Sequence, residues 1–374
     1  MLSITVARVT PPTVTRLESL TGLRAIAAAA VFGFHALAVG LVDTPVAQWL
    51  FRQGATGVSF FFLLSGFVLA WSTRPGDTMR RFWQRRLAKV WPNHAAAWAV
   101  ALAGLVAAGT TVGVGTALAT LLLLQAWVPD EGVYFGVNTV AWSLSCEAFF
   151  YALFPALWAL ARRLPERALW PTLAGVLALV WIVPAAALTI PADLRYWAIW
   201  VLPAARLPEF VAGILLARLV AAGRWPRWAS VGRVAVLVVA AYLASWWLPE
   251  LWRLVAGTVV PLALLVAAVA ARDVQGRRSW LRSRPAVVAG EWSYAFYLLH
   301  LLVLSVLVKA VGDNRPLLVE LAVVLVALAV AVAASGAMYR LVEVPGMRLL
   351  RPRPIAPIPD STARPGVLSS RSGG

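Results

Sequence analysis

Residues 21–36 read TGLRAIAAAAVFGFHA, an apolar run that contains an arginine, Arg24, and a histidine, His35. At about 100° per residue, positions eleven apart are only about 20° out of register, so both side chains share one helix face, roughly 16 Å apart along the axis. Charged and titratable groups are costly in hydrocarbon, so they usually face a protein interior and mark functional sites. The segment therefore predicts a membrane-spanning helix that contributes residues to a functional site.

The composition supports a membrane setting for the whole chain. Of the 374 residues, 61% are hydrophobic and 13% are charged, whereas a soluble domain typically has about 25% charged residues. Apolar stretches near the length needed to cross a bilayer recur along the chain. We therefore expect an all-α fold: a polytopic transmembrane helical bundle in the cell membrane, with the lipid bilayer as its surroundings.

Some classes of protein and site are disfavoured by charge and residue counts. The net charge of +17 would favour nucleic-acid binding in a soluble protein, but the arginines lie mostly in short loops, where topology explains them. No nucleic-acid partner is therefore expected. The single cysteine, Cys146, excludes an intrachain disulfide and a cysteine-based metal cluster. The three histidines are dispersed and have no metal-ligand spacing, so we expect no metal site.

The apolar stretches and the cationic loops predict the topology. The apolar stretches are 20–41, 54–72, 92–110, 113–128, 141–160, 170–190, 197–219, 230–248, 252–271, 289–311 and 316–339. Arginine-rich segments at 74–89, 161–167, 218–233 and 272–284 alternate with loops poor in positive charge. The positive-inside rule then places these segments and both termini in the cytoplasm.

This topology raises a question of parity. Two cytoplasmic loops, 74–89 and 161–167, must be joined by an even number of crossings, but three apolar stretches lie between them. One of 113–128 and 141–160 is therefore expected not to cross completely, or to enter and return. Such backbone is tolerated at membrane depth where protein covers it or where it lines a cavity. We expect about ten membrane-crossing helices.

One membrane domain is expected, over residues 18–348. Residues 1–17 lack a continuous apolar run, so we expect a flexible N-terminus without a cleavable signal peptide. Residues 349–374 are rich in Pro, Ser and Arg with almost no packing residues. This composition is typical of a disordered cytoplasmic tail.

The first polar candidates are Arg24, His35 and a cationic cluster. Arg24 is either a snorkelling arginine at the interface or a functional cation, and His35 is either a buried, hydrogen-bonded histidine or a general base. Arg85, Arg86 and Lys89 lie in MRRFWQRRLAKVWPNH, residues 79–94. Topology explains such a loop, but cations beside aromatic rings also suit a nucleotide-carrying donor with phosphates. His94, near an interface, is expected to be solvated.

Two further stretches carry polar groups inside apolar helices. Glu147 is the only carboxylate in AWSLSCEAFFYALFP, residues 141–155, and it follows Trp142. It either pairs with an interior arginine or acts on a histidine or a substrate hydroxyl, since an unpaired carboxylate there is costly. Ser65-Gly66 in VSFFFLLSGFVLAWS, residues 58–72, favours close helix packing. Ser65 lacks the strand–turn–helix context of a nucleophile elbow, so we do not expect it to be a nucleophile.

The last stretch is EWSYAFYLLHLLV, residues 291–303. Tyr294, Tyr297 and His300 recur every third residue, on one broad helix face. His300 either bonds a tyrosine or the backbone, or it lines a cavity for an acceptor. We expect Tyr297, His300 and Trp142 to form that cavity.

Seven segments in this order carry a resemblance to a known family. They are TGLRAIAAAAVFGFH, FFFLLSGFVLAWS, RRLAKVWP, WSLSCEAFFYALFP, RLPEFVAGILLA, SYAFYLLH and RLVEVPG. Together they resemble the integral-membrane acyltransferase 3 family, over about residues 20–348. The forms SLTGLR, FFFLLSGFVLAWS and WSLSCE look more like its macrolide-tailoring branch than its polysaccharide branch. No hydrolase-like domain is expected after the last apolar stretch, although some members of the family carry one.

The resemblance implies transfer of an acyl group, commonly acetyl, from coenzyme A to a hydroxyl of a glycan, lipid or natural product. Acyl-CoA (acetyl-CoA) is then a co-substrate, and no bound cofactor is expected. The family's Arg-to-His motif falls on Arg24 and His35, and its conserved Glu falls on Glu147. Its Arg-x-x-Arg motif falls on Arg86 and Lys89, a departure because lysine lacks the bidentate fork of arginine.

From these residues we expect a membrane O-acyltransferase with His35 as general base and with Arg24 and Glu147 as further catalytic residues. Arg85, Arg86 and Lys89 are expected to bind the acyl donor. The alternative from another class is a proton-coupled transporter, which would also need buried Arg, His and Glu. The inverted repeats common in transporters are not evident in this sequence.

Overall fold

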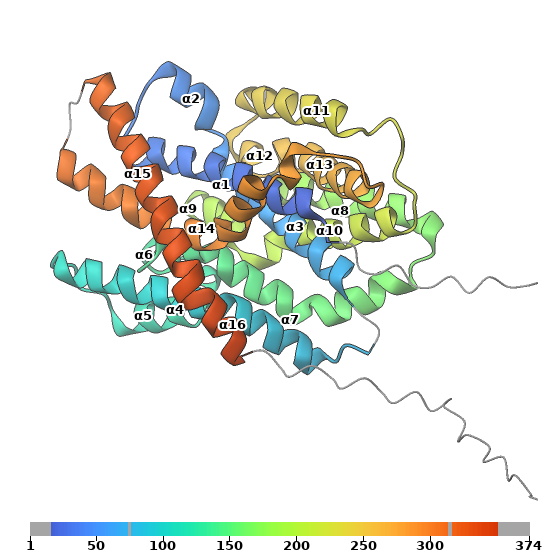
Figure 1. The fold of residues 1–374 in the computed structure, drawn as a ribbon, viewed down its shortest axis with the longest axis horizontal. Coiled ribbons are helices and arrows are strands. Elements are labelled where there is room, and N and C mark those ends of the chain that lie inside the picture. Colours follow the sequence, from blue (N-terminus) through green and yellow to red (C-terminus); the bar gives the residue numbers. More distant parts are fainter. Residues whose placement is uncertain (1–15, 74–75, 313–315, 351–374) are drawn as a thin grey trace, which may run out of the picture.

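The computed structural model describes residues 16–73, 76–312 and 316–350. Within these residues it consists of helices and turns, with no strand. The long helices that could cross a membrane form a bundle (Figure 1). They are α1 (Glu18–Ala38), α3 (Gly57–Ser72), α4 (Met79–Ala107), α7 (Trp142–Arg163), α8 (Glu166–Ala187), α10 (Pro203–Ala221), α13 (Ala256–Val274), α14 (Arg284–Val311) and α15 (Leu317–Met338).

Short helices extend or connect the long ones. They are α2 (Pro45–Phe51), η1 (Gly54–Thr56), α5 (Val114–Leu121), η2 (Gln125–Trp127), α6 (Glu131–Tyr134), η3 (Thr139–Ala141), α9 (Ala192–Tyr196), η4 (Trp197–Val201), α11 (Val231–Ala244), η5 (Ser245–Trp247), α12 (Glu250–Leu254), η6 (Trp280–Arg282), η7 (Tyr339–Glu343) and α16 (Val344–Leu350). Nine helical stretches of the described chain are long and apolar enough to span a membrane, and Val231–Trp247 is a shorter apolar one. The prediction of a polytopic helical membrane protein is confirmed.

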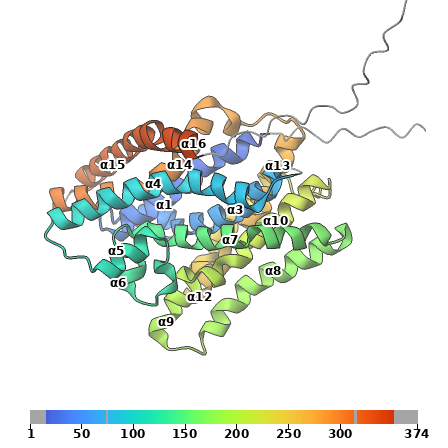
Figure 2. The same cartoon turned by 90° about the horizontal axis from the view of Figure 1, so that it is seen from below.

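The structure answers the parity question between 113–128 and 141–160. The first stretch holds the eight-residue helix α5 and the three-residue helix η2, each too short to cross, and the chain turns between them at Leu123 with a φ of +58°. The second stretch is part of α7, which has 22 residues. Figure 2 shows α5 and α6 as short helices beside α4 and α7. The incomplete crossing is therefore 113–128.

The cationic segment after residue 78 is helical as well. α4 begins at Met79, and Thr78 caps its first turn by accepting a hydrogen bond from the backbone N–H of Arg81 at 3.3 Å. The predicted apolar span began only at residue 92. The cations of the segment therefore stand on a regular helix, where residues three apart are neighbours.

The two terminal segments lie largely outside the described residues. Of the predicted flexible N-terminus, 1–17, only Arg16 and Leu17 are described: Arg16 bonds Glu291 at 2.5 Å and Leu17 is buried. Of the predicted tail, 349–374, only the last two residues of α16 are described.

Helices α3 and α10 lie at the centre of the bundle, and α11 and α15 lie at its edges (Figure 1). The central contact depends on glycines. A Cβ built on Gly66 would lie 1.9 Å from the carbonyl oxygen of Phe210, and one built on Gly213 would lie 2.0 Å from that of Leu63. The two backbones therefore approach as closely as small residues allow. This confirms the packing role predicted for Gly66.

Helix α1 is held at its first turn by a residue from α13. The backbone N–H and the hydroxyl of Ser19 both donate to the carboxylate of Asp273, at 2.8 and 2.5 Å. The first turn of a helix has backbone donors without intrahelical partners, so the carboxylate satisfies one of them. Helix α1 also packs along α14. The helix that carries Arg24 and His35 is therefore fixed both at its first turn and along its length.

Candidate active site

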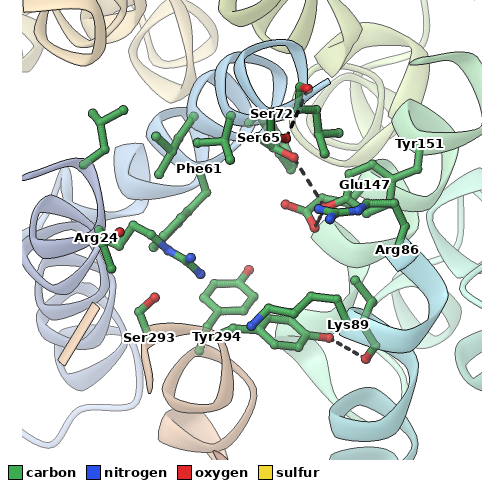
Figure 3. A pocket seen from close by; sticks show the side chains of 18 of the residues that line it. Arg24, Phe61, Ser65, Ser72, Arg86, Lys89, Glu147, Tyr151, Ser293 and Tyr294 are labelled. Carbon is green, nitrogen blue, oxygen red and sulfur yellow. Dashed lines mark hydrogen bonds between the residues drawn. The ribbon is translucent and has the colours of Figure 1, made fainter. Parts of the chain in front are cut away.

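A cavity of about 360 Å³ lies between five helices, α1, α3, α4, α7 and α14 (Figure 3). Its polar lining brings together residues that are far apart in the sequence. They are Arg16, Thr21, Arg24, Ser65, Ser72, Arg86, Lys89, Ser143, Glu147, Tyr151, Ser293, Tyr294 and Tyr297. Both the volume and the mixture of apolar walls with a few convergent polar groups are typical of small-molecule sites.

Cations reach this cavity from two sides. Arg24 extends into it from α1, and Arg86 enters from α4, beside Glu147 (Figure 3). The Nε of Arg24 is buried and has no hydrogen-bond partner within the described chain. Such a donor is available to a ligand.

Lys89 also lines the cavity, but its ammonium group is already paired. It donates to Glu343 of η7, a fully buried carboxylate that also accepts from the side-chain amide of Asn93 at 2.5 Å. Because one of the ammonium donors is used in this way, Lys89 offers a ligand less than a free lysine would. The ion pair also fastens α4 to the C-terminal helices.

Glu147 faces the cavity rather than lipid. It accepts a hydrogen bond from the hydroxyl of Tyr151 at 2.7 Å, and the hydroxyl of Ser65 lies 3.4 Å from that of Tyr151. Sequence reasoning overlooked Tyr151. Its position four residues after Glu147 was the available signal, since such pairs meet on one helix face.

Tyr297 lines the cavity and also reaches a histidine. Its hydroxyl donates to the carbonyl of Val140 at 3.1 Å and lies 2.8 Å from the hydroxyl of Ser143. Its ring lies 5.8 Å, centre to centre, from the ring of His300. Tyr297 thus contacts both the cavity and His300.

His35 and His300 contact each other and do not line this cavity. Nε2 of His300 lies 3.0 Å from Nδ1 of His35, and His300 is fully buried. Although Arg24 and His35 share one helix face, their side chains lie in different environments: Arg24 lines the cavity, and His35 contacts His300.

Three other residues singled out from the sequence lie outside the cavity. Arg85 bonds Asp77 through both terminal nitrogens, at 2.9 and 2.8 Å. Trp142 is buried against the guanidinium of Arg206, 5.9 Å from the ring centre. His94 was expected to be solvated, and this is wrong: it is fully buried, with Nε2 3.1 Å from the carbonyl of Leu121.

Comparison with known proteins identifies the family. The family model described as an acyltransferase domain matches residues 17–340. The chain belongs to this family, acyltransferase 3. It is similar to the acyltransferase MdmB of Streptomyces mycarofaciens, with 41% identity over 94% of this chain and 97% of that protein.

A second relative is the exopolysaccharide production protein ExoZ of Rhizobium meliloti (strain 1021), with 31% identity over 70% of this chain and 80% of that protein. No solved structure matches. The predictions of the family, of an O-acyltransferase enzyme and of a multi-pass membrane protein are confirmed. Membership of this family favours the enzyme over the transporter alternative.

Proposed function

We propose that this acyltransferase moves an acyl group, acetyl in the simplest case, from acyl-CoA to a hydroxyl of a glycan or macrolide-type natural product, with His35 as general base. One observation carries the proposal. Tyr297 lines the cation-lined cavity and contacts His300, which in turn contacts His35. A site for an anionic donor and a candidate base are therefore adjacent inside one helical bundle.

The cations of the cavity support acyl-CoA as the donor. Its phosphates are anionic, and arginines bind phosphate through two parallel hydrogen bonds. Arg24 and Arg86 come from different helices, so a donor between them would be held from both sides. Arg85 is less suited to this role than its neighbour, because Asp77 already occupies its guanidinium.

The proposed reaction needs few groups. His35 takes the proton of the acceptor hydroxyl while the hydroxyl oxygen attacks the thioester carbonyl. The new C–O bond forms, the C–S bond breaks, and the leaving thiolate takes the proton back from His35. Arg24, whose buried Nε has no partner within the described chain, stabilises the negative charge that develops on the carbonyl oxygen, while Arg86 binds the donor phosphates. The apolar walls of the cavity limit competition from water as acceptor.

The acceptor side is proposed to involve Tyr297, since it lies between the cavity and His300. The name of ExoZ refers to exopolysaccharide production, which supports a glycan acceptor. The forms of the motifs in this chain support the macrolide-type one. In both cases the reacting group is a hydroxyl of a carbohydrate or polyketide, and a test needs acceptors of both kinds.

Release of coenzyme A by the purified protein tests the proposal. In detergent, acetyl-CoA and a mixture of hydroxyl-bearing acceptors should give acceptor-dependent thiol release and an acetylated product by mass spectrometry. His35→Ala should abolish both while expression and folding stay near wild type, because no other group of the proposed mechanism takes the acceptor proton. A His35→Ala enzyme that retains most of its turnover would remove His35 from the mechanism.

A further inference from the structure

The mechanism above uses His35 but not the residue that contacts it. His300 comes from α14, and its ring centre lies 5.0 Å from that of His35 on α1. The contact joins Nε2 of His300 to Nδ1 of His35, at 3.0 Å. Two imidazoles at this distance share one hydrogen, so one ring must donate and the other must accept.

A backbone carbonyl decides which ring accepts. Nδ1 of His300 lies 3.1 Å from the carbonyl oxygen of Phe296. A carbonyl oxygen can only accept, so Nδ1 of His300 carries a hydrogen. A neutral imidazole has a single N–H, and Nε2 of His300 therefore has a lone pair. The opposite tautomer would leave two acceptors facing each other in a buried site, which is costly.

The same logic then assigns the hydrogen of His35. Its Nδ1 lies 3.0 Å from Nε2 of His300, which has the lone pair, and 3.1 Å from the carbonyl oxygen of Val31. Both neighbours are acceptors, so Nδ1 of His35 is the donor and its hydrogen is shared between them. Nε2 of neutral His35 is consequently the unprotonated nitrogen, which is the form that a general base requires.

The surroundings of the pair leave His300 as the residue that orients the imidazole of His35. The neighbours of His300 are the rings of Phe32, Phe296 and Tyr297, and the Tyr297 hydroxyl donates to Val140. Neither imidazole is bonded to a carboxylate in the part of the chain that the structure describes. The orienting group of this base is therefore another imidazole.

We infer that His300 is a positioning residue: its Nε2 lone pair accepts the Nδ1–H of His35 and so holds the imidazole with Nε2 ready to take the acceptor proton. The inference rests on the proposed function. A nucleophile or base oriented by a third group is the general arrangement of such sites. When His35 takes the proton, its bond to His300 becomes charge-assisted and therefore stronger.

Two substitutions of His300 test whether its effect on catalysis comes from accepting a hydrogen bond or only from filling space. His300→Gln places an amide oxygen where it can accept, whereas His300→Leu fills the space without an acceptor. We expect His300→Leu to lower kcat about 10- to 100-fold, somewhat less than loss of the base itself, with the KM for acyl-CoA unchanged. His300→Gln should return kcat to within about fivefold of wild type, as expected for a restored hydrogen bond.

His94→Leu is the matched control, since His94 is also fully buried and also bonds a backbone carbonyl, that of Leu121. It should keep the wild-type kcat per folded molecule. Equal turnover of His300→Leu and His300→Gln, or wild-type turnover of His300→Leu, would overturn the inference. If a variant does not fold, the measurement on the wild-type protein below decides.

The tautomers can be read directly in the wild-type protein. With only three histidines in the chain, ¹⁵N-histidine labelling gives few imidazole signals, and they are assigned from the single variants. We expect His35 and His300 both to carry hydrogen on Nδ1. Hydrogen on Nε2 of His300 would refute the pairing. This result does not depend on activity, so it stands apart from a failure of coenzyme A release, which would refute the proposed function instead.

Discussion

Arg85 and Arg86 are adjacent in the sequence, but helix geometry turns them to different surroundings. Arg85 pairs with Asp77 at the exposed side of α4, and Arg86 lines the cavity opposite Arg24. Adjacent residues on a helix do not face the same way. Variants of the two arginines therefore compare a cation at the proposed donor site with a cation outside it.

Arg86→Ala should raise the KM for acyl-CoA about tenfold, corresponding to about 1.4 kcal/mol of lost binding, and change kcat less. This is the pattern of lost ground-state binding. Arg85→Ala should leave the donor KM unchanged, and acyl-CoA titrations of both purified variants measure the difference. Equal donor KM values in wild type and in Arg86→Ala would argue against a donor site at Arg86.

Lys89 is less suitable for the same test. Removing its ammonium group would leave the buried carboxylate of Glu343, among the residues that the structure describes, with the hydrogen bond from Asn93. A buried charge that loses its counterion is strongly destabilising. Loss of activity in Lys89→Ala would then mix donor binding with stability, which Arg86→Ala avoids.

At the scale of elements, the packing of α3 on α10 positions one wall of the site. Ser65 of α3 lies in the cavity wall, and Gly66 beside it faces α10. The close approach of the two backbones thus sets where Ser65, and through it Tyr151, stand relative to Glu147. Any side chain at Gly66 must push the helices apart.

Gly66→Ala should destabilise the protein by about 1–3 kcal/mol, the usual cost of overpacking a well-packed contact. The matched control is Gly175→Ala in the interior of α8, where an added Cβ meets nothing within 4 Å. There the substitution should stabilise slightly, by about 0.5–1 kcal/mol. Thermal unfolding in detergent, followed by the fluorescence of the 19 tryptophans, checks both; equal midpoints would contradict the role of Gly66.

At the scale of the whole molecule, one buried ion pair joins several helices. Arg206 bonds Glu209 at 2.6 Å, the carbonyl of Trp200 at 2.9 Å and the hydroxyl of Ser59 at 3.0 Å. Its guanidinium also stacks over three rings, those of Phe62, Trp142 and Trp200. A charge in hydrocarbon needs such complete satisfaction, so the cluster fixes how α3, α7 and α10 meet.

Arg206→Leu should cost about 3–5 kcal/mol, because it leaves Glu209 buried without its partner. The double variant Arg206→Leu/Glu209→Leu should be more stable than the single one, since no uncompensated charge remains. Arg224→Leu, at an exposed pair with Glu166, should cost only about 0–1 kcal/mol. Denaturation of the three variants in detergent tests this order, and a double variant less stable than Arg206→Leu would contradict it.

The sidedness predicted from charge can be tested with introduced cysteines. The native Cys146 is buried, so it gives little background for labelling. Thr110 and Ser230 are exposed, in the connections after α4 and before α11. In intact cells, a membrane-impermeant maleimide should label Thr110→Cys, but Ser230→Cys only after permeabilisation. The reverse pattern would place the termini outside.

The sequence alone determined the class of the molecule and most of its spans. Lengths near 20 apolar residues, a low charge content and arginines confined to loops are local properties, and a helix that must satisfy its backbone in lipid follows from them directly. The close helix contact at Gly66 was predictable because a small residue pair inside an apolar helix is also a local property of the sequence. The resemblance to the acyltransferase family was also carried by local motifs.

Only the tertiary structure decided which polar groups meet. Helix periodicity placed Arg24 and His35 on one face, but the neighbours of that face come from α3, α4, α7 and α14, distant in sequence. Those neighbours put Arg24 in the cavity and His35 against His300, and they left Arg85, Trp142 and His94 outside it. Spacing along one helix cannot specify such contacts, because the partner helices are chosen by packing over the whole bundle.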